Sequence, residues 1–92
     1  MGDFSGKTVL ITGGAGFFGD ILKRSLLERG YKVVSIDLEK DTMEAKNLVT
    51  VQGDIRNAKL LDELFAAYAF SAVFHLAAIL AQFADQHFAG IA

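Results

Sequence analysis

A cluster of glycines follows a short apolar run, and the spacing of these glycines predicts a role in ligand binding. The run at residues 9–11 is followed by Gly13, Gly14, Gly16 and Gly19, and an apolar-periodic segment comes next. Glycine permits a tight turn with positive φ and a close approach of the backbone to a ligand. The start of a helix presents N–H groups without intrahelical partners, which bind phosphate. The G-x-G-x-x-G at Gly14, Gly16 and Gly19 therefore predicts a turn that binds the pyrophosphate of a dinucleotide. A glycine-rich turn without a ligand is the alternative.

A carboxylate follows the next apolar run. Asp37 ends residues 32–37, and at this position an acid accepts hydrogen bonds from the adenosine ribose hydroxyls. Such a carboxylate repels a 2′-phosphate, and Leu38 stands beside it in place of an arginine, so the pattern favours NAD over NADP. Lys40 lies close enough to leave NADP open. The alternative is a solvated aspartate in a turn.

Three further polar residues follow apolar runs. Asp54 could accept the adenine amino group, with the backbone N–H of Ile55 on a ring nitrogen, but an aspartate in a turn is more often a cap. The Thr12 hydroxyl could bond the turn backbone, or the residue could be there for its β propensity. His75, inside an apolar run, is interpreted as a core histidine with its hydrogen bonds satisfied rather than as a base.

Alternating strands and helices must position these residues. The strands are predicted at residues 7–12, 32–37, 48–52 and 72–76, and the helices at residues 17–29 and 57–69. Residues 39–46 are a loop or a short helix, and the apolar residues 77–92 could be helical. Asn57 is the predicted N-cap of the second helix, and Gly30 the residue that ends the first.

The first helix shows an amphipathic pattern. Phe18, Ile21, Leu22, Ser25 and Leu26 recur at helical spacing, so Phe18 is predicted to lie in the core. The charged residues are predicted to lie mostly on the opposite, solvated face; they are Asp20, Lys23, Arg24 and Glu28. Tyr31 and Tyr68 are interpreted as packing residues.

The order of elements predicts an α/β fold. Short connections and right-handed crossovers place about four strands in one parallel Rossmann-type sheet, in the order 3-2-1-4, with flanking helices. No composition shift marks a second domain, so residues 1–92 are predicted to form a single dinucleotide-binding domain.

Composition excludes several classes of function. The chain has 92 residues, no cysteine, two histidines and a net charge of −2, which disfavours disulfides, a metal site and nucleic acid as a partner. With no signal peptide at its start, the expected location is the cytoplasm.

Residues 64–84 form a run of 21 residues without formal charge, long enough for a transmembrane helix. A helix–strand–helix unit explains the run better, because Ser71, His75 and Gln82 interrupt it and no basic cluster flanks it; no membrane association is expected.

Four ordered motifs resemble the extended short-chain dehydrogenase/reductases, in particular the NAD-dependent epimerase/dehydratase family that acts on nucleotide sugars. They lie at residues 12–19, 37–38, 53–55 and 75–78. The resemblance implies a phosphate turn at Gly13, Gly16 and Gly19, with the backbone of Phe17 and Phe18 at the pyrophosphate. It further implies that Asp37 and Leu38 lie at the ribose, Asp54 and Ile55 at adenine, and Leu76, Ala77 and Ala78 along the cofactor. His75 remains structural.

The family's catalytic Tyr-x-x-x-Lys is missing from this sequence, because Ser35 and Ala72 stand four residues after Tyr31 and Tyr68. In such enzymes the tyrosine moves a proton while NAD takes a hydride. The resemblance therefore implies a truncated, NAD-binding N-terminal part that is inactive alone and meets a nucleotide sugar only in a full-length chain. The alternative is a non-catalytic dinucleotide-binding or sensing module that acts through a partner. The outer edge of the fourth strand predicts a homo-oligomer.

Overall fold

Four strands form one parallel sheet. In the computed structural model, which describes residues 7–76, the strands are β1 (Thr8–Thr12), β2 (Lys32–Asp37), β3 (Leu48–Gln52) and β4 (Phe70–His75). Their spatial order is β3-β2-β1-β4, and all three pairings are parallel. The predicted α/β fold and the strand order 3-2-1-4 are confirmed.

The bounds of β4 differ from the prediction, which placed this strand at residues 72–76. The strand starts two residues earlier, because a register shift pairs Phe70 with Thr8 and Ala72 with Val9. It ends at His75, which lies opposite Thr12, so Leu76 is outside the strand. β1 begins one residue later than predicted, and β2 and β3 have the predicted bounds.

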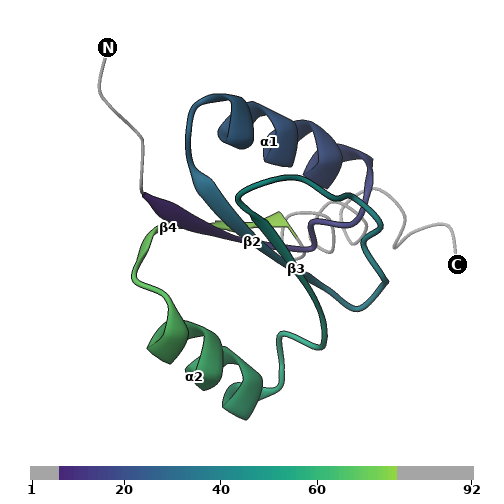
Figure 1. The fold of residues 1–92 in the computed structure, drawn as a ribbon. Coiled ribbons are helices and arrows are strands. Elements are labelled where there is room, and N and C mark those ends of the chain that lie inside the picture. The colour runs from purple at the N-terminus through teal and green to yellow at the C-terminus, as the bar shows by residue number, and fades with distance from the viewer. Residues whose placement is uncertain (1–6, 77–92) are drawn as a thin grey trace, which may run out of the picture.

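Two helices cover opposite faces of the sheet, as Figure 1 shows. They are α1 (Phe17–Glu28) and α2 (Ala58–Ala67). The Asn57 side chain caps α2 by accepting a hydrogen bond from the Leu60 amide at 3.2 Å, as predicted. Gly30, with φ of +88°, follows the last turn of α1, where a left-handed residue suits glycine. α2 ends before the predicted residue 69, because Tyr68 already has extended dihedral angles. Residues 39–46 form neither helix nor strand.

The core has one half on each face of the sheet. Under α1, Leu26 packs with Val9, Ile11 and Val33. Under α2, the buried residues are Leu10, Val34, Ile36 and Leu64. Successive strand residues point to opposite faces, so these near-continuous apolar strands bury both of their faces, as central parallel strands do. Tyr31 packs against the first cluster and Tyr68 against the second, which confirms both as packing residues.

The orientation of α1 corrects the predicted helix faces. Lys23 was assigned to the solvated face, yet it is 0% exposed. Phe18 and Ile21, assigned to the apolar face, are exposed. The burial of Lys23 is accompanied by a tertiary contact: Asp41, from the segment between β2 and β3, forms an ion pair with its ammonium group.

No helix within residues 7–76 is long and apolar enough to cross a membrane. The part of the uncharged run that the structure describes forms the end of α2 and the strand β4.

Candidate functional site

The carboxyl ends of the four strands meet at one edge of the sheet, where ligands bind in open α/β folds. The glycine turn follows β1 at this edge. Gly13 adopts φ of +74°, in the left-handed region that favours glycine, and its amide donates to the Ile36 carbonyl at 2.8 Å. The turn is therefore tied to the neighbouring strand β2.

The structure treats two glycines of the turn, Gly19 and Gly16, differently: one has no room for a side chain and the other has. A Cβ on Gly19 would lie 2.2 Å from the Gly14 carbonyl oxygen, so this position must lack a side chain for α1 to pack against the turn. A Cβ on Gly16 would meet nothing within 4 Å. Gly16 has φ of −88° and caps α1 without any side-chain hydrogen bond. No contact within the described chain explains a glycine there, and its predicted role in the close approach of a ligand stays a prediction.

The first turn of α1 presents backbone donors. The hydrogen bond from the Asp20 amide to the Gly16 carbonyl, at 2.9 Å, closes the first helical turn. The amides of Phe17, Phe18 and Gly19 precede it and carry the partial positive charge of the helix start. The Phe17 and Phe18 rings are 74% and 62% exposed, with centroids 5.7 Å apart in an edge-to-face arrangement. The prediction that Phe18 lies in the core is wrong, because its side chain stands outside the helix–sheet contact.

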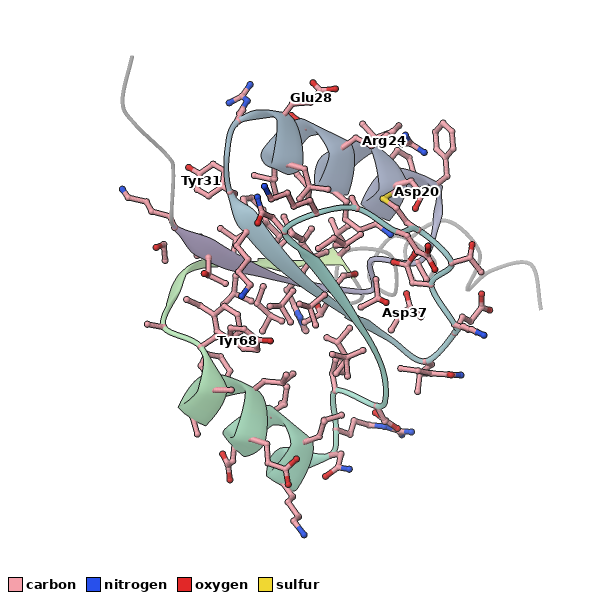
Figure 2. The ribbon with its side chains drawn as sticks, in the orientation of Figure 1. Asp20, Arg24, Glu28, Tyr31, Asp37 and Tyr68 are labelled. Carbon is pink, nitrogen blue, oxygen red and sulfur yellow. The ribbon has the colours of Figure 1, made fainter. Side chains whose placement is uncertain are left out.

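Asp37 connects the end of β2 to the glycine turn. Its Oδ2 accepts a hydrogen bond from the Ala15 amide at 3.0 Å, and its Oδ1 accepts one from the Glu39 amide at 2.9 Å. Figure 2 shows Asp37 on the side of the molecule where Asp20 marks the start of α1. A carboxylate has about four acceptor positions, so two remain for further donors. The predicted proximity of the acid to the glycine bend is thus present in the structure.

One pocket, of about 240 Å³, adjoins Asp37. It brings together five of the residues to which the sequence assigned a cofactor role: Gly13, Asp37, Leu38, Asp54 and Ile55. Ile36, Gly53 and Arg56 complete its wall. The ends of β1, β2 and β3 therefore converge on one concave surface.

Asp54 acts as a turn cap in the structure. Its Oδ1 accepts a hydrogen bond from the Arg56 amide at 2.8 Å, and the Arg56 guanidinium contacts both carboxylate oxygens, with Nη2 to Oδ2 at 2.7 Å. These bonds hold the pKa of Asp54 below its ordinary value and raise the pKa of Arg56. An adenine-binding role for Asp54 stays a prediction.

Sequence reasoning missed Arg56. It lines the pocket beside Asp37 and also a second pocket, of about 330 Å³, which extends to His75. The available signal was its place two residues after Asp54, where an Asx turn brings the backbone amide onto the carboxylate.

At the carboxyl ends of β1 and β4, Thr12 pairs with His75. The Thr12 hydroxyl lies 2.5 Å from His75 Nδ1. Thr12 is buried and bonds this ring rather than the turn backbone, and His75 is hydrogen-bonded but exposed, so its predicted core location is wrong. Leu76 packs at the margin of the cluster under α1. Ala77 and Ala78 lie outside the described residues, and the role of all three along a cofactor stays a prediction.

Comparisons with known proteins identify the family. The model of the NAD dependent epimerase/dehydratase family matches residues 9–88. UDP-glucuronate 4-epimerase 1 of Arabidopsis thaliana is 35% identical over 85 residues, covering 79% of this chain and 20% of the relative. A 3-beta-hydroxysteroid dehydrogenase of Mycolicibacterium neoaurum is 42% identical over 85 residues, covering 87% and 23% of the two chains.

A solved structure shares the fold and about a third of the aligned residues. The Bordetella bronchiseptica enzyme WbmH, crystallised in complex with NAD+, superimposes with a TM-score of 0.68 at 36% identity, over 75% of this chain and 25% of that one. The chain thus spans 20–25% of the length of these three proteins. Because the family model matches most of the chain, and the matched part contains the glycine turn and its acid, the chain belongs to the NAD-dependent epimerase/dehydratase family.

Proposed function

We propose that this chain binds the adenosine and pyrophosphate part of NAD, as the N-terminal part of a nucleotide-sugar epimerase or dehydratase. The observation that carries the proposal is the hydrogen bond from the Ala15 amide to the Asp37 carboxylate, at 3.0 Å. It joins the glycine turn and the acid, the two recognition elements of a dinucleotide site, in one continuous surface.

The residues of the turn fit a pyrophosphate. The amides of Phe17 and Phe18 would donate to phosphate oxygens, and the positive end of the α1 dipole favours the negative charge. The open space at Gly16 allows the phosphates to approach the backbone, because no side chain of the described chain occupies it.

The pocket beside Asp37 fits the adenosine. The free acceptor positions of Asp37 would accept hydrogen bonds from the ribose hydroxyls. Leu38 and Ile55, which line the pocket, would offer apolar surface to the adenine ring. The Ile55 amide and the Asp54 carboxylate are the proposed contacts to the ring edge. A carboxylate at the ribose disfavours a 2′-phosphate, which supports NAD over NADP.

Bound NAD would supply a hydride acceptor, so the reaction of the whole protein is proposed to proceed through transfer of a hydride to NAD and its later return. The name of the Arabidopsis relative, a UDP-glucuronate 4-epimerase, supports a nucleotide sugar as the substrate of the whole protein. The steroid dehydrogenase match covers 87% of the chain and the Arabidopsis match 79%, so the two overlap; this supports a role of the shared part in cofactor binding rather than in substrate choice.

Titration calorimetry with NAD tests the proposal. The variant Asp37→Ala removes the acceptors for both ribose hydroxyls, so we expect its Kd to rise about tenfold or more, since hydrogen bonds to a charged group contribute about 1.5–3 kcal/mol. Asp62→Ala is the matched control, because Asp62 is an exposed aspartate of α2, outside the residues that line the pocket. Its Kd should equal that of the unaltered chain.

Two outcomes contradict the proposal. One is a folded, unaltered chain that gives no heat of binding with NAD at millimolar concentration. The other is an Asp37→Ala variant that binds as well as the Asp62→Ala control.

A further inference from the structure

Lys23 carries a buried charge on a helix whose polar residues were predicted to face solvent. Its side chain is 0% exposed, and its Nζ forms an ion pair with Asp41 and another with Asp20 Oδ1, at 3.0 Å. A buried ammonium group is costly unless it is paired, so the position of Asp41 is fixed by that of Lys23.

Asp41 lies within the segment 38–47, which joins β2 to β3. Its side chain is 7% exposed. One carboxylate oxygen faces Lys23, and the other accepts a hydrogen bond from the Met43 amide at 3.0 Å. Asp41 therefore both orders its own segment and attaches it to α1.

The same segment begins at the proposed ribose acid. The Glu39 amide donates to Asp37 Oδ1, and the Ala15 amide donates to Asp37 Oδ2. A polar pocket of about 380 Å³ borders this region and is lined by Ala15 of the glycine turn together with Asp20, Lys40 and Asp41. The carboxylate that would meet the cofactor is thus held between the glycine turn and a segment attached through Lys23.

We propose that Lys23 is a positioning residue: through Asp41 it fixes the segment 38–47 and, with it, the orientation of the Asp37 carboxylate toward the adenosine ribose. This inference rests on the proposed NAD-binding function. An apolar side chain at position 23 would fill the same space but would not hold Asp41, since apolar contact is not directional. Replacing a buried ion pair by apolar groups is often neutral for stability, so the role proposed for this pair is to define the arrangement of the segment.

The experiment compares the unaltered chain with Lys23→Met and the double variant Lys23→Met/Asp41→Asn. Lys46→Met, at an exposed lysine of the same segment, is the matched control. The double variant leaves no unpaired charge on Asp41, so it stays folded even where Lys23→Met does not. Hydrogen–deuterium exchange is measured at the amides of residues 39–47 without cofactor. The Kd for NAD and for adenosine monophosphate is measured by calorimetry well below the unfolding midpoint.

In the double variant we expect exchange at residues 39–47 about tenfold faster, with the exchange of β1 and β2 unchanged, because only local opening is affected. The Kd for both ligands should rise by the same factor, about tenfold, because both contain the adenosine ribose. A change in stability alone would not alter the affinity of the folded protein. The Lys46→Met control should match the unaltered chain in both measurements.

The outcomes separate the two proposals. An unaltered chain that binds neither ligand overturns the proposed function, and with it the positioning role. If the unaltered chain binds NAD, the inference alone is overturned by unchanged exchange at residues 39–47 in the double variant. It is equally overturned by faster exchange with a Kd equal to that of the control.

Discussion

Gly19 and Gly16 belong to the same turn but should respond to alanine in opposite ways. At Gly19 the added Cβ would lie 2.2 Å from the Gly14 carbonyl oxygen and 2.5 Å from its carbon. These are backbone atoms, so relief requires the turn to move away from α1. At Gly16 the Cβ would meet nothing within 4 Å, and the negative φ suits any residue.

The magnitude at Gly19 follows from two opposing effects. Overpacking costs about 1–3 kcal/mol, and a backbone collision belongs at the upper end of that range. Alanine gains up to about 1 kcal/mol over glycine inside a helix, which offsets part of the cost. We therefore expect Gly19→Ala to lower the free energy of unfolding by about 2 kcal/mol, which corresponds to about 8–16 °C in Tm for a domain of this size.

At Gly16 we expect the reverse: little change in stability and weaker binding of NAD. Loss of glycine at an N-cap costs about 0.5–1 kcal/mol at most, so Gly16→Ala should unfold within a few degrees of the unaltered chain. Its Cβ would occupy the space through which phosphate approaches the backbone, and the Kd for NAD should rise about tenfold or more. Thermal denaturation measures the unfolding temperature, urea denaturation the free energy of unfolding, and titration calorimetry the Kd for NAD.

Either of two results would contradict these expectations. If Gly19→Ala is as stable as Gly16→Ala, the collision with Gly14 does not determine the packing of α1 on the turn. If Gly16→Ala binds NAD with unchanged affinity, the turn is not a phosphate site.

Three further predictions concern the core, the Asp54 turn and the edge of the sheet. Leu64 is the buried residue of α2, so Leu64→Ala should lower the free energy of unfolding by about 2–5 kcal/mol in urea denaturation, while Lys59→Ala at an exposed position of α2 should not. Because the pKa of Asp54 is depressed below 3.8 in the folded chain, its stabilising effect is present above that pH and is lost as the pH falls through the lower folded value. Urea midpoints of the unaltered chain and of Asp54→Asn should therefore differ at neutral pH and converge in strong acid; a constant difference would contradict the pairing with Arg56. β4 pairs on one side with β1, and its other edge is free in the described sheet, so we expect association of copies in size-exclusion chromatography with light scattering. A monomer at all concentrations would contradict this expectation.

The sequence by itself determined the architecture. Apolar runs at β1 and β2 predicted strands buried on both faces, and the helical spacing between them predicted the crossover. Asn57 and Gly30 marked ends of the helices through local chemistry, a side-chain acceptor in one case and a left-handed φ in the other. The strand order followed from the handedness of parallel crossovers, a rule that needs no knowledge of side-chain packing. The glycine turn and Asp37 could also be recognised from the sequence, because both lie close to the ends of predicted strands.

Only the tertiary structure decided which side chains became partners. Periodicity placed Lys23 on the solvated face of α1, but the side chain is buried and paired with Asp41, 18 residues away in the sequence. The pairing of Thr12 with His75, 63 residues apart in the sequence, likewise depended on where the ends of β1 and β4 come to lie. Hydrophobic periodicity reports the preference of each residue for water, averaged over one helix or strand. The partner of a charged or polar group is set by the folded arrangement of the segments around it, and an ion pair can reverse that preference when the chain brings the opposite charge to the same place.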